Sequence, residues 1–161
     1  MRGVTLFLAG LLLGLGVQTG LAQGAGDNII GVNHVGINVA DFDAAMKFYT
    51  EQMGFRKAFV VNDANGKPTQ GYIHVSRNTF LEIRPAGANQ PVGAITHVGI
   101  EVDNIRATLA RLSKNGVKVE EPRPGINFAT IANATSPDGT RMELSELGPE
   151  SLQRKAINSY K

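Results

Sequence analysis

Asn33-His-Val-Gly-Ile-Asn-Val39 and Thr96-His-Val-Gly-Ile-Glu-Val102 are two copies of one segment, and they decide the fold. The core of each copy, His-Val-Gly-Ile, is identical and begins at His34 and again at His97. Self-similarity at a fixed interval is typical of duplicated structure. The sequence therefore predicts two related modules that each begin with a strand.

The stretch after each copy has the same succession of elements. Apolar residues recur at helical spacing in residues 41–53 and again in residues 104–115, so we expect one amphipathic helix in each half. Shorter strand-like segments bounded by turn residues follow each helix. They are residues 55–61, 71–76 and 79–84 in the first half, and 117–120, 128–133 and 141–146 in the second half. The expected fold class is α+β, with eight strands and two helices.

The composition limits the chemistry that is available. The chain has 161 residues, 42% of them hydrophobic, so it can bury an ordinary core and does not resemble a disordered chain. Its 16 basic and 14 acidic residues nearly balance, which argues against a nucleic-acid partner. There is no cysteine, so disulfides, thiolate metal sites and cysteine nucleophiles are excluded. Any metal site must be built from carboxylates and from the three histidines.

The N-terminus has the features of a secretory signal peptide. Arg2 precedes an apolar run at residues 4–17, and small residues stand at Gly20 and Ala22, which predicts cleavage after Ala22. The alternative is an uncleaved membrane anchor, but a helix over this run would span only about 21 Å of a hydrocarbon core about 30 Å thick. We therefore expect a secreted or periplasmic protein without stable membrane insertion after cleavage, with a flexible leader at residues 23–29.

Each module carries one histidine on its first strand and one glutamate on its last. His34 is matched with Glu82, and His97 with Glu143. Because alternate residues of a strand face opposite sides, the apolar neighbours of these residues would point toward the helices and all four polar side chains to the other face. A single such residue is more often only a solvated polar group. Four at matched positions predict a divalent metal site made of His34, Glu82, His97 and Glu143.

The chain resembles the vicinal oxygen chelate superfamily, which includes glyoxalase I, methylmalonyl-CoA epimerase, extradiol dioxygenases, and fosfomycin- and bleomycin-resistance proteins. The resemblance covers residues 30–147, with modules at 30–86 and 94–147 and a C-terminal tail at 148–161. It implies two tandem βαβββ modules that form a cup-shaped sheet around a metal, in a homodimer. The markers are His-Val-Gly-Ile at both module starts, Phe48-Tyr49, Gly54-Phe55, and Ser136-Pro-Asp-Gly-Thr-Arg-Met-Glu-Leu144.

Within that superfamily the set of ligands is similar to that of glyoxalase I. It implies a metal-dependent lyase, lactoylglutathione lyase-like, or an epimerase, with Zn, Ni, Co or Mn favoured over Fe. The metal would hold two neighbouring oxygens of a small substrate and stabilise an ene-diolate. By analogy Glu143 would be the catalytic base, and Glu82 its counterpart on the other face.

Two departures from the bacterial glyoxalase I pattern argue against glutathione as a substrate. Asn38 stands where that pattern has an arginine, and Ala86 where it has an asparagine. Arg84, beside Glu82, is either an anion-binding residue or a surface arginine at a strand end, and His74 is a packing residue or faces the cup. The alternatives to the lyase are a non-catalytic small-molecule binding or resistance protein and a non-haem iron dioxygenase.

Overall fold

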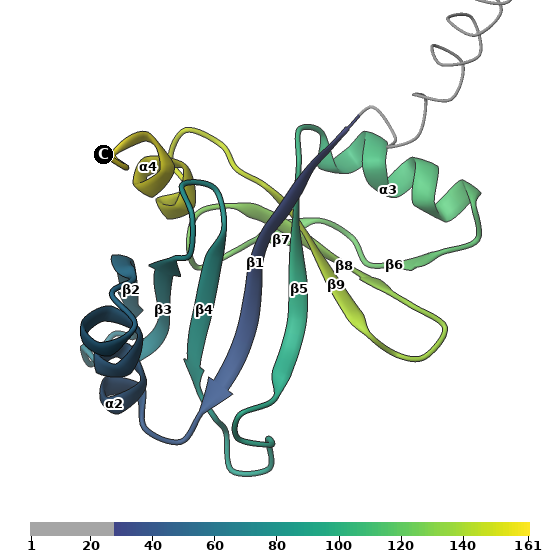
Figure 1. Ribbon diagram of the computed structural model, residues 1–161. Helices are drawn as coiled ribbons and strands as arrows, with labels where there is room; N and C mark the ends of the chain where they lie inside the picture. The colour runs from purple at the N-terminus through teal and green to yellow at the C-terminus, as the bar shows by residue number, and fades with distance from the viewer. Residues whose placement is uncertain (1–27) are drawn as a thin grey trace, which may run out of the picture.

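The two repeated segments form neighbouring strands at the centre of one sheet, β1 (Ile29–Val39) and β5 (Ile95–Val102) (Figure 1). The two strands pair antiparallel, so the modules meet along this seam with their chains running in opposite directions. The computed structural model describes residues 28–161. The predicted signal peptide and most of the predicted leader lie outside the described residues, and β1 begins one residue before the predicted module boundary.

Each module adds strands outward from the seam in the same order. In the first module β4 (Phe80–Pro85) pairs parallel with β1, and β3 (Pro68–His74) and β2 (Arg56–Asn62) follow antiparallel. The second module repeats the order with β9, β8 and β6. Their bounds are Arg141–Glu146, Thr130–Thr135 and Lys118–Val119. The α+β class and the repeated module are thus confirmed.

The described residues contain nine strands rather than the predicted eight. The additional strand is β7 (Arg123–Pro124), which pairs with β8 and stands off the main path of the sheet. The sequence by itself predicts a break here, because Pro122, Pro124 and Gly125 interrupt the chain between two strands. A proline can still occupy a short edge strand, where its missing N–H removes no inner hydrogen bond.

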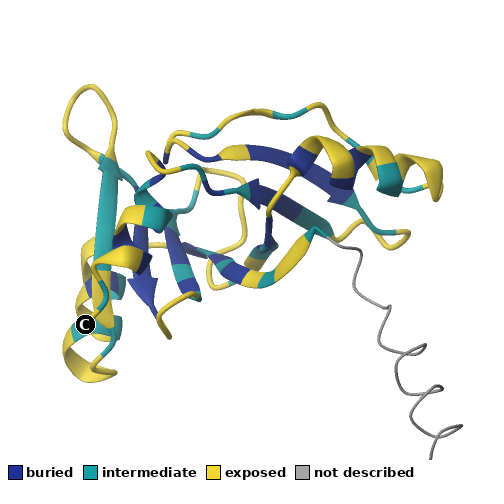
Figure 2. Cartoon of the chain, turned by 90° about the horizontal axis from the view of Figure 1, so that it is seen from above, coloured by how far each residue is buried: buried dark blue, intermediate teal, exposed yellow. Residues whose placement is uncertain are grey.

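The predicted helices lie against the two halves of the sheet, one in each module. The first is α2 (Phe42–Lys47), continued by a π-helical turn, η1 (Phe48–Gln52), and the second is α3 (Ile105–Lys114). Asp41 and Asn104 cap them by accepting a hydrogen bond from the backbone N–H three residues on, both at 2.9 Å. Figure 2 shows the buried residues concentrated along the strands between these exposed helix faces.

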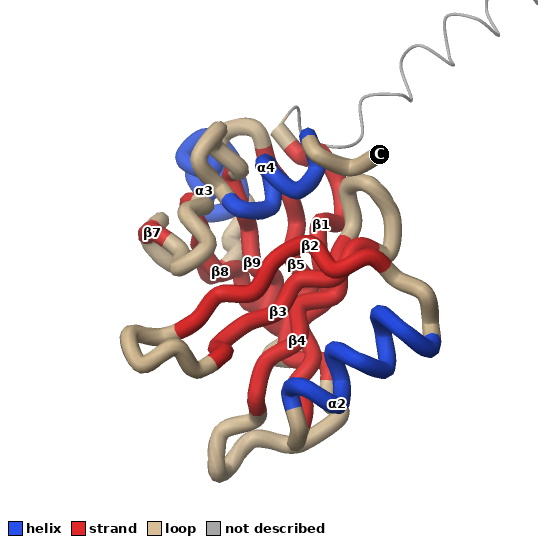
Figure 3. The backbone as a smooth tube through the Cα atoms, turned by 90° about the vertical axis from the view of Figure 1, so that its left-hand side faces the viewer, coloured by secondary structure: helices blue, strands red, loops and turns tan. Residues whose placement is uncertain are grey.

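A third helix, α4 (Leu152–Asn158), forms in the tail, to which sequence reasoning gave no role. Ser151 caps it, and Figure 3 shows it beside the ends of the strands on the same side as α3. Its buried residues Ala156 and Ile157 join a core cluster with Tyr72 of the first module and Ile131 of the second. The helix therefore closes one end of the sheet and contacts both modules. None of the helices within residues 28–161 is both long and apolar enough to span a bilayer.

Candidate metal centre

Two rows of paired residues cross the seam of the sheet and bring the predicted ligands together. In one row Glu82 pairs with Gly36, which in turn pairs with His97. In the other row Glu143 pairs with Gly99, which pairs with His34. Residues paired across strands share a face of the sheet. All four predicted side chains therefore project from one face, each module supplying the glutamate of one row and the histidine of the other.

The glycine of each His-Val-Gly-Ile segment provides the space for the histidine of the other module. A Cβ placed on Gly99 would overlap the imidazole of His34, and a Cβ on Gly36 would overlap that of His97. Both imidazoles are almost completely buried, at 0% and 1% exposure. Glycine is thus required here by the close approach of a side chain rather than by a turn.

The donor atoms of the four side chains converge within hydrogen-bonding distance. The Nε2 atoms of His34 and His97 are 3.0 Å apart. Glu82 Oε2 lies 3.3 Å from His34 Nε2 and 3.1 Å from His97 Nε2. Glu143 Oε1 lies 3.5 Å from His34 Nε2. His34, His97 and Glu143 offer ligand atoms that are all within 4.8 Å of one another. Glu82 does not belong to this group of three and contacts it through the two imidazoles.

These separations are those of ligands around one divalent ion. Two atoms about 2.1 Å from a metal stand about 3.0 Å apart at a right angle and about 3.4 Å apart at a tetrahedral angle. Two neutral imidazoles and two carboxylates also compensate the charge of such an ion. The residues therefore fit a divalent cation with nitrogen and oxygen ligands. The identity of the metal does not follow from the geometry.

A buried chain of polar groups fixes which nitrogen of His34 faces the site. Arg154 pairs with Glu101 at 2.5 Å, and Glu101 accepts a hydrogen bond from the Asn33 amide nitrogen at 3.5 Å. The Asn33 oxygen is thereby turned toward His34 Nδ1, 3.0 Å away, and also accepts from Gln153 at 3.4 Å. When the imidazole is neutral, Nδ1 then carries the proton and Nε2 presents its lone pair to the site. The helix α4 thus contributes to the centre through Gln153 and Arg154.

Both glutamates are ionised although they are buried. Burial by itself would raise the pKa of Glu82, but the hydrogen bond with His97 and the charges of the two imidazoles outweigh it and lower that pKa. Glu143 follows the same pattern. Burial alone would raise its pKa, but the hydrogen bond with His34 and the charges of the two imidazoles outweigh burial, so the pKa of Glu143 is lowered. A divalent cation bound here would replace the imidazole protons, so that two ionised carboxylates and two imidazole lone pairs would face it.

Tyr72 is a further polar group of this face that sequence reasoning missed. It lies in register with Glu82 on the neighbouring strand β3, so it extends the same row. Burial and the negative charges of Glu82 and Glu143 raise the pKa of Tyr72 well above its ordinary value near 10. The phenol therefore keeps its proton and acts as a hydrogen-bond donor in the site.

A small polar cavity of about 160 Å³ opens onto the candidate metal centre. Glu143 and Tyr72 lie in its wall, together with Gln70 and residues of the loop that follows β7. Three arginines also line it, one from β4, one from β7 and one from β9: Arg84, Arg123 and Arg141. The cavity gives a small molecule access to the Glu143 carboxylate.

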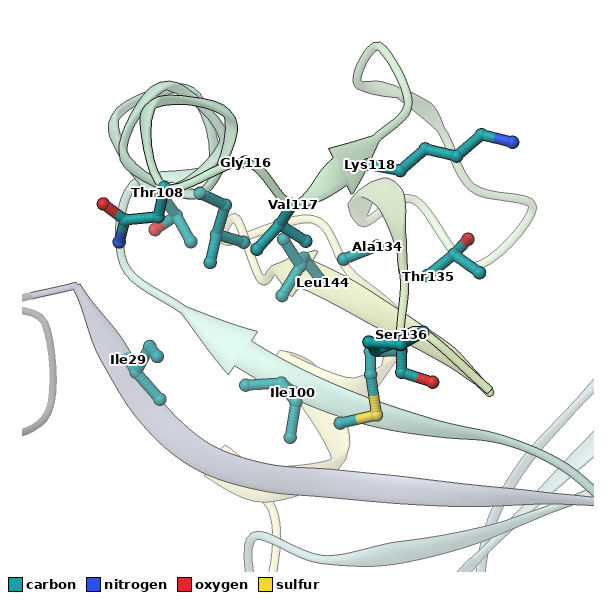
Figure 4. A pocket seen from close by; sticks show the side chains of 14 residues that line it. Ile29, Ile100, Thr108, Gly116, Val117, Lys118, Ala134, Thr135, Ser136 and Leu144 are labelled. Atoms are coloured by element: carbon teal, nitrogen blue, oxygen red, sulfur yellow. The ribbon is translucent and has the colours of Figure 1, made fainter. Parts of the chain in front are cut away.

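A larger cavity lies elsewhere in the described residues. It measures about 780 Å³ and is formed between α3 and the sheet, with Ile29, Ile100 and Leu144 pointing into it (Figure 4). None of the four predicted ligands lines it, and its walls are mainly apolar. The larger cavity therefore lacks the side chains that could do chemistry. The smaller, polar cavity is the candidate active site.

The two remaining residues that the sequence singled out have different positions. Arg84 faces the site: its Nη1 atom is 3.5 Å from Glu82 Oε1, and its side chain is 40% exposed. His74 does not reach the centre. It packs between the rings of Phe80 and Tyr160, and its Nδ1 atom lies 3.1 Å from the Ser76 carbonyl oxygen.

The polar chain behind His34 leads to a first prediction. Asn33→Ala removes the acceptor that holds the proton on Nδ1, so we expect divalent metal affinity to fall about 10- to 100-fold, the usual cost of losing such a group. Competition with a chelator measures it. Asn38→Ala is the matched control, because Asn38 is equally buried on the same strand but bonds to Gln90. Equal losses in the two variants would contradict the role of Asn33.

Comparison with known proteins agrees with the fold. Residues 31–144 match the family model of the Glyoxalase/Bleomycin resistance protein/Dioxygenase superfamily. The chain is 34% identical over 124 residues to a probable chloroplastic lactoylglutathione lyase of Arabidopsis thaliana, covering 72% of this chain and 35% of that protein. It is 27% identical over 96 residues to the mitochondrial methylmalonyl-CoA epimerase of Mus musculus, covering 54% of each. The chain thus spans only about a third to a half of these two relatives.

Among solved structures, methylmalonyl-CoA epimerase from Mycobacterium tuberculosis has the same fold. It superposes with a TM-score of 0.66 at 24% identity, over 78% of this chain and 93% of that one. The family model covers most of the described chain, and its match includes both histidines and both glutamates. The chain therefore belongs to the Glyoxalase/Bleomycin resistance protein/Dioxygenase superfamily.

Proposed function

We propose that this chain is a metal-dependent lyase or isomerase of the glyoxalase type, acting on a small oxygenated compound. The observation that carries the proposal is the convergence of four donor atoms, two from each module, at the inner end of a polar cavity. The curated relatives named above, a lactoylglutathione lyase and a methylmalonyl-CoA epimerase, support the same class of reaction.

The two carboxylates have different access to a substrate. The Glu143 side chain is 10% exposed and lines the cavity, whereas that of Glu82 is 1% exposed and is held at Oε1 by Gln70, 2.8 Å away. Glu143 is therefore the better placed base, and Glu82 is the more firmly held ligand. A bound divalent cation would supply the Lewis acid that holds two neighbouring substrate oxygens and favours the ene-diolate over the parent carbonyl.

Glu143 is in the form that a base requires. The carboxyl group is ionised at neutral pH and can accept a proton from a carbon beside the bound oxygens, but its lowered pKa makes it a weaker base than an ordinary glutamate, so the bound cation would have to acidify that carbon. Arg141 lies 3.6 Å from its other oxygen and orients the carboxylate. Tyr72, protonated and lining the same cavity, can donate a hydrogen bond to a substrate oxygen on which negative charge develops.

Metal binding and proton exchange test the proposal together. The purified protein is expected to contain close to one divalent metal ion per chain, or to take one up after chelation and reloading. With metal it should exchange a carbon-bound proton of a small α-hydroxy ketone for deuterium from D2O, and chelation should stop this exchange. A chain that neither carries nor takes up a metal would refute the proposal.

The same experiment separates the two reaction types. An isomerase or lyase that moves a proton between neighbouring carbons places deuterium on the second carbon, whereas an epimerase returns it to the first. Both reaction types need a carboxylate near the reacting carbon. The site contains one carboxylate from each module, Glu82 and Glu143.

We also propose that the chain is exported, on the strength of its N-terminal sequence alone. The charged Arg2, the apolar run at residues 4–17 and the small residues before Gln23 support this. Mass spectrometry of the protein recovered from its source should find Gln23 as the first residue. An intact N-terminus on a cytosolic protein would contradict the proposal. Assembly as a homodimer stays a prediction.

A further inference from the structure

We infer that the substrate of this site is a small anion that carries a hydroxyl group beside its reactive oxygens, bound by Arg84, Arg123 and Arg141. This inference rests on the proposed function and names the substrate class of the same site. It is carried by the three arginines that line the cavity, by an unpaired buried oxygen of Gln70 and by the volume of the cavity.

The charge of the cavity wall is strongly one-sided. The three arginines line it, and Glu143 is the only acidic residue that does so among the described residues. Glu82 lies just behind, 3.5 Å from Arg84. A divalent cation would neutralise the two glutamates, and the three guanidinium groups would then remain without a counter-charge. A carboxylate or phosphate group on the substrate would supply it.

The arginines lie near the candidate metal centre, and only some of their hydrogen-bond donors have a partner. Arg84 and Arg141 flank it symmetrically, two residues after Glu82 and two before Glu143, and contact those carboxylates at 3.5 and 3.6 Å. Each guanidinium has five donors, so most remain free for a ligand. Arg123, on the exposed strand β7, forms no ion pair with any residue of 28–161.

One buried atom indicates the hydroxyl group. Gln70 lines the cavity, and its amide nitrogen donates to Glu82 Oε1 at 2.8 Å, which fixes the orientation of the amide. Its oxygen is buried without a hydrogen-bond partner in the described chain. A buried acceptor left unpaired is costly, and a hydroxyl donor of the substrate would satisfy it.

The volume limits the size of the bound group. About 160 Å³ is well below the 300–1,000 Å³ that is common for sites of drug-sized ligands. The cavity therefore encloses a compound of a few carbon atoms, or only the reacting end of a larger one.

Three probes with the same hydroxyl and carbonyl oxygens test the inference: dihydroxyacetone, which is neutral, hydroxypyruvate, which has a carboxylate, and dihydroxyacetone phosphate. Titration calorimetry on the metal-loaded protein is expected to show at least about tenfold tighter binding of one or both anions than of the neutral probe. The anion that binds more tightly identifies the group that the arginines accept. Equal affinity for all three would overturn the inference.

Arginine variants separate this inference from the proposed function. Arg84→Gln and Arg123→Gln should each reduce the preference for the anion about tenfold or less, and the double variant should nearly abolish it, with metal content unchanged. Arg106→Gln, an exposed arginine on α3, is the charge-matched control and should keep the preference. An unchanged preference in the double variant overturns the inference while metal-dependent exchange still stands. If the chain binds no metal, the proposed function fails, and inorganic phosphate binding to the same variants still tests the arginines.

Discussion

Glu143→Gln is expected to reduce metal-dependent proton exchange by about 10²- to 10⁴-fold, the usual range for loss of a general base. The amide has the shape of the carboxylate but cannot take up the proton. The two histidines and Glu82 remain in place, so the variant should still bind one metal ion. Exchange of substrate protons in D2O, followed by NMR at saturating metal, measures the loss.

The control for this change is Glu150→Gln, because Glu150 is exposed and pairs only with Lys155 at the surface. It makes the same chemical substitution and should leave exchange unaltered. Metal content is measured on both proteins, so a loss of metal is not mistaken for a loss of the base. Undiminished exchange in a metal-loaded Glu143→Gln protein would exclude Glu143 as the base.

Gly99→Ala is expected to lower metal affinity by 100-fold or more, although no ligand is changed. The new methyl group would occupy the position of the His34 imidazole, which is fully buried and has no space to move into. The effect should exceed the 10- to 100-fold that is typical when a group behind a ligand is lost, because here the ligand itself is displaced. Gly36→Ala should do the same through His97. Chelator competition measures both affinities.

Two other glycines provide controls. Gly71 is also crowded, but its Cβ would meet Phe42 and Met46 on the helix side of the sheet. Gly71→Ala should therefore lower thermal stability with little effect on the metal affinity of the folded protein. Gly148 has open space around it, and Gly148→Ala should change neither. If Gly99→Ala binds metal as tightly as the unaltered chain, the steric role of Gly99 is wrong.

The fold was predictable because the same succession of sequence patterns occurs in both halves of the chain. Two copies of one strand, each followed by helical and then strand periodicity, are enough for the α+β class and the module order. The alternation of strand residues also placed both histidines and both glutamates on one face. Periodicity did not reveal two short elements. They are β7, where Pro124 and the preceding Pro122 predict a break, and α4, whose few apolar residues are buried only by tertiary contacts.

The groups that surround the ligands were mostly out of reach of sequence reasoning. Asn33 and Gln153 lie 120 positions apart, and no local pattern connects them. Tyr72 and Gln70 had a detectable signal, since both occupy alternate positions on the strand next to Glu82, but the register between the strands was needed to use it. The glycines of His-Val-Gly-Ile were visible as a repeated motif. Their reason became clear only when each was seen beside the histidine of the other copy.

The crossed arrangement of histidine and glycine has a consequence for the origin of the chain. One module by itself has a histidine and a glutamate, but the space that its histidine requires lies in its neighbour. Two separate copies of such a module, paired antiparallel along the edges of their first strands, would place the same two histidines and two glutamates around one point. At its centre this chain is therefore equivalent to a dimer of modules joined end to end. A half-length ancestor would already have possessed the whole site once it paired with itself.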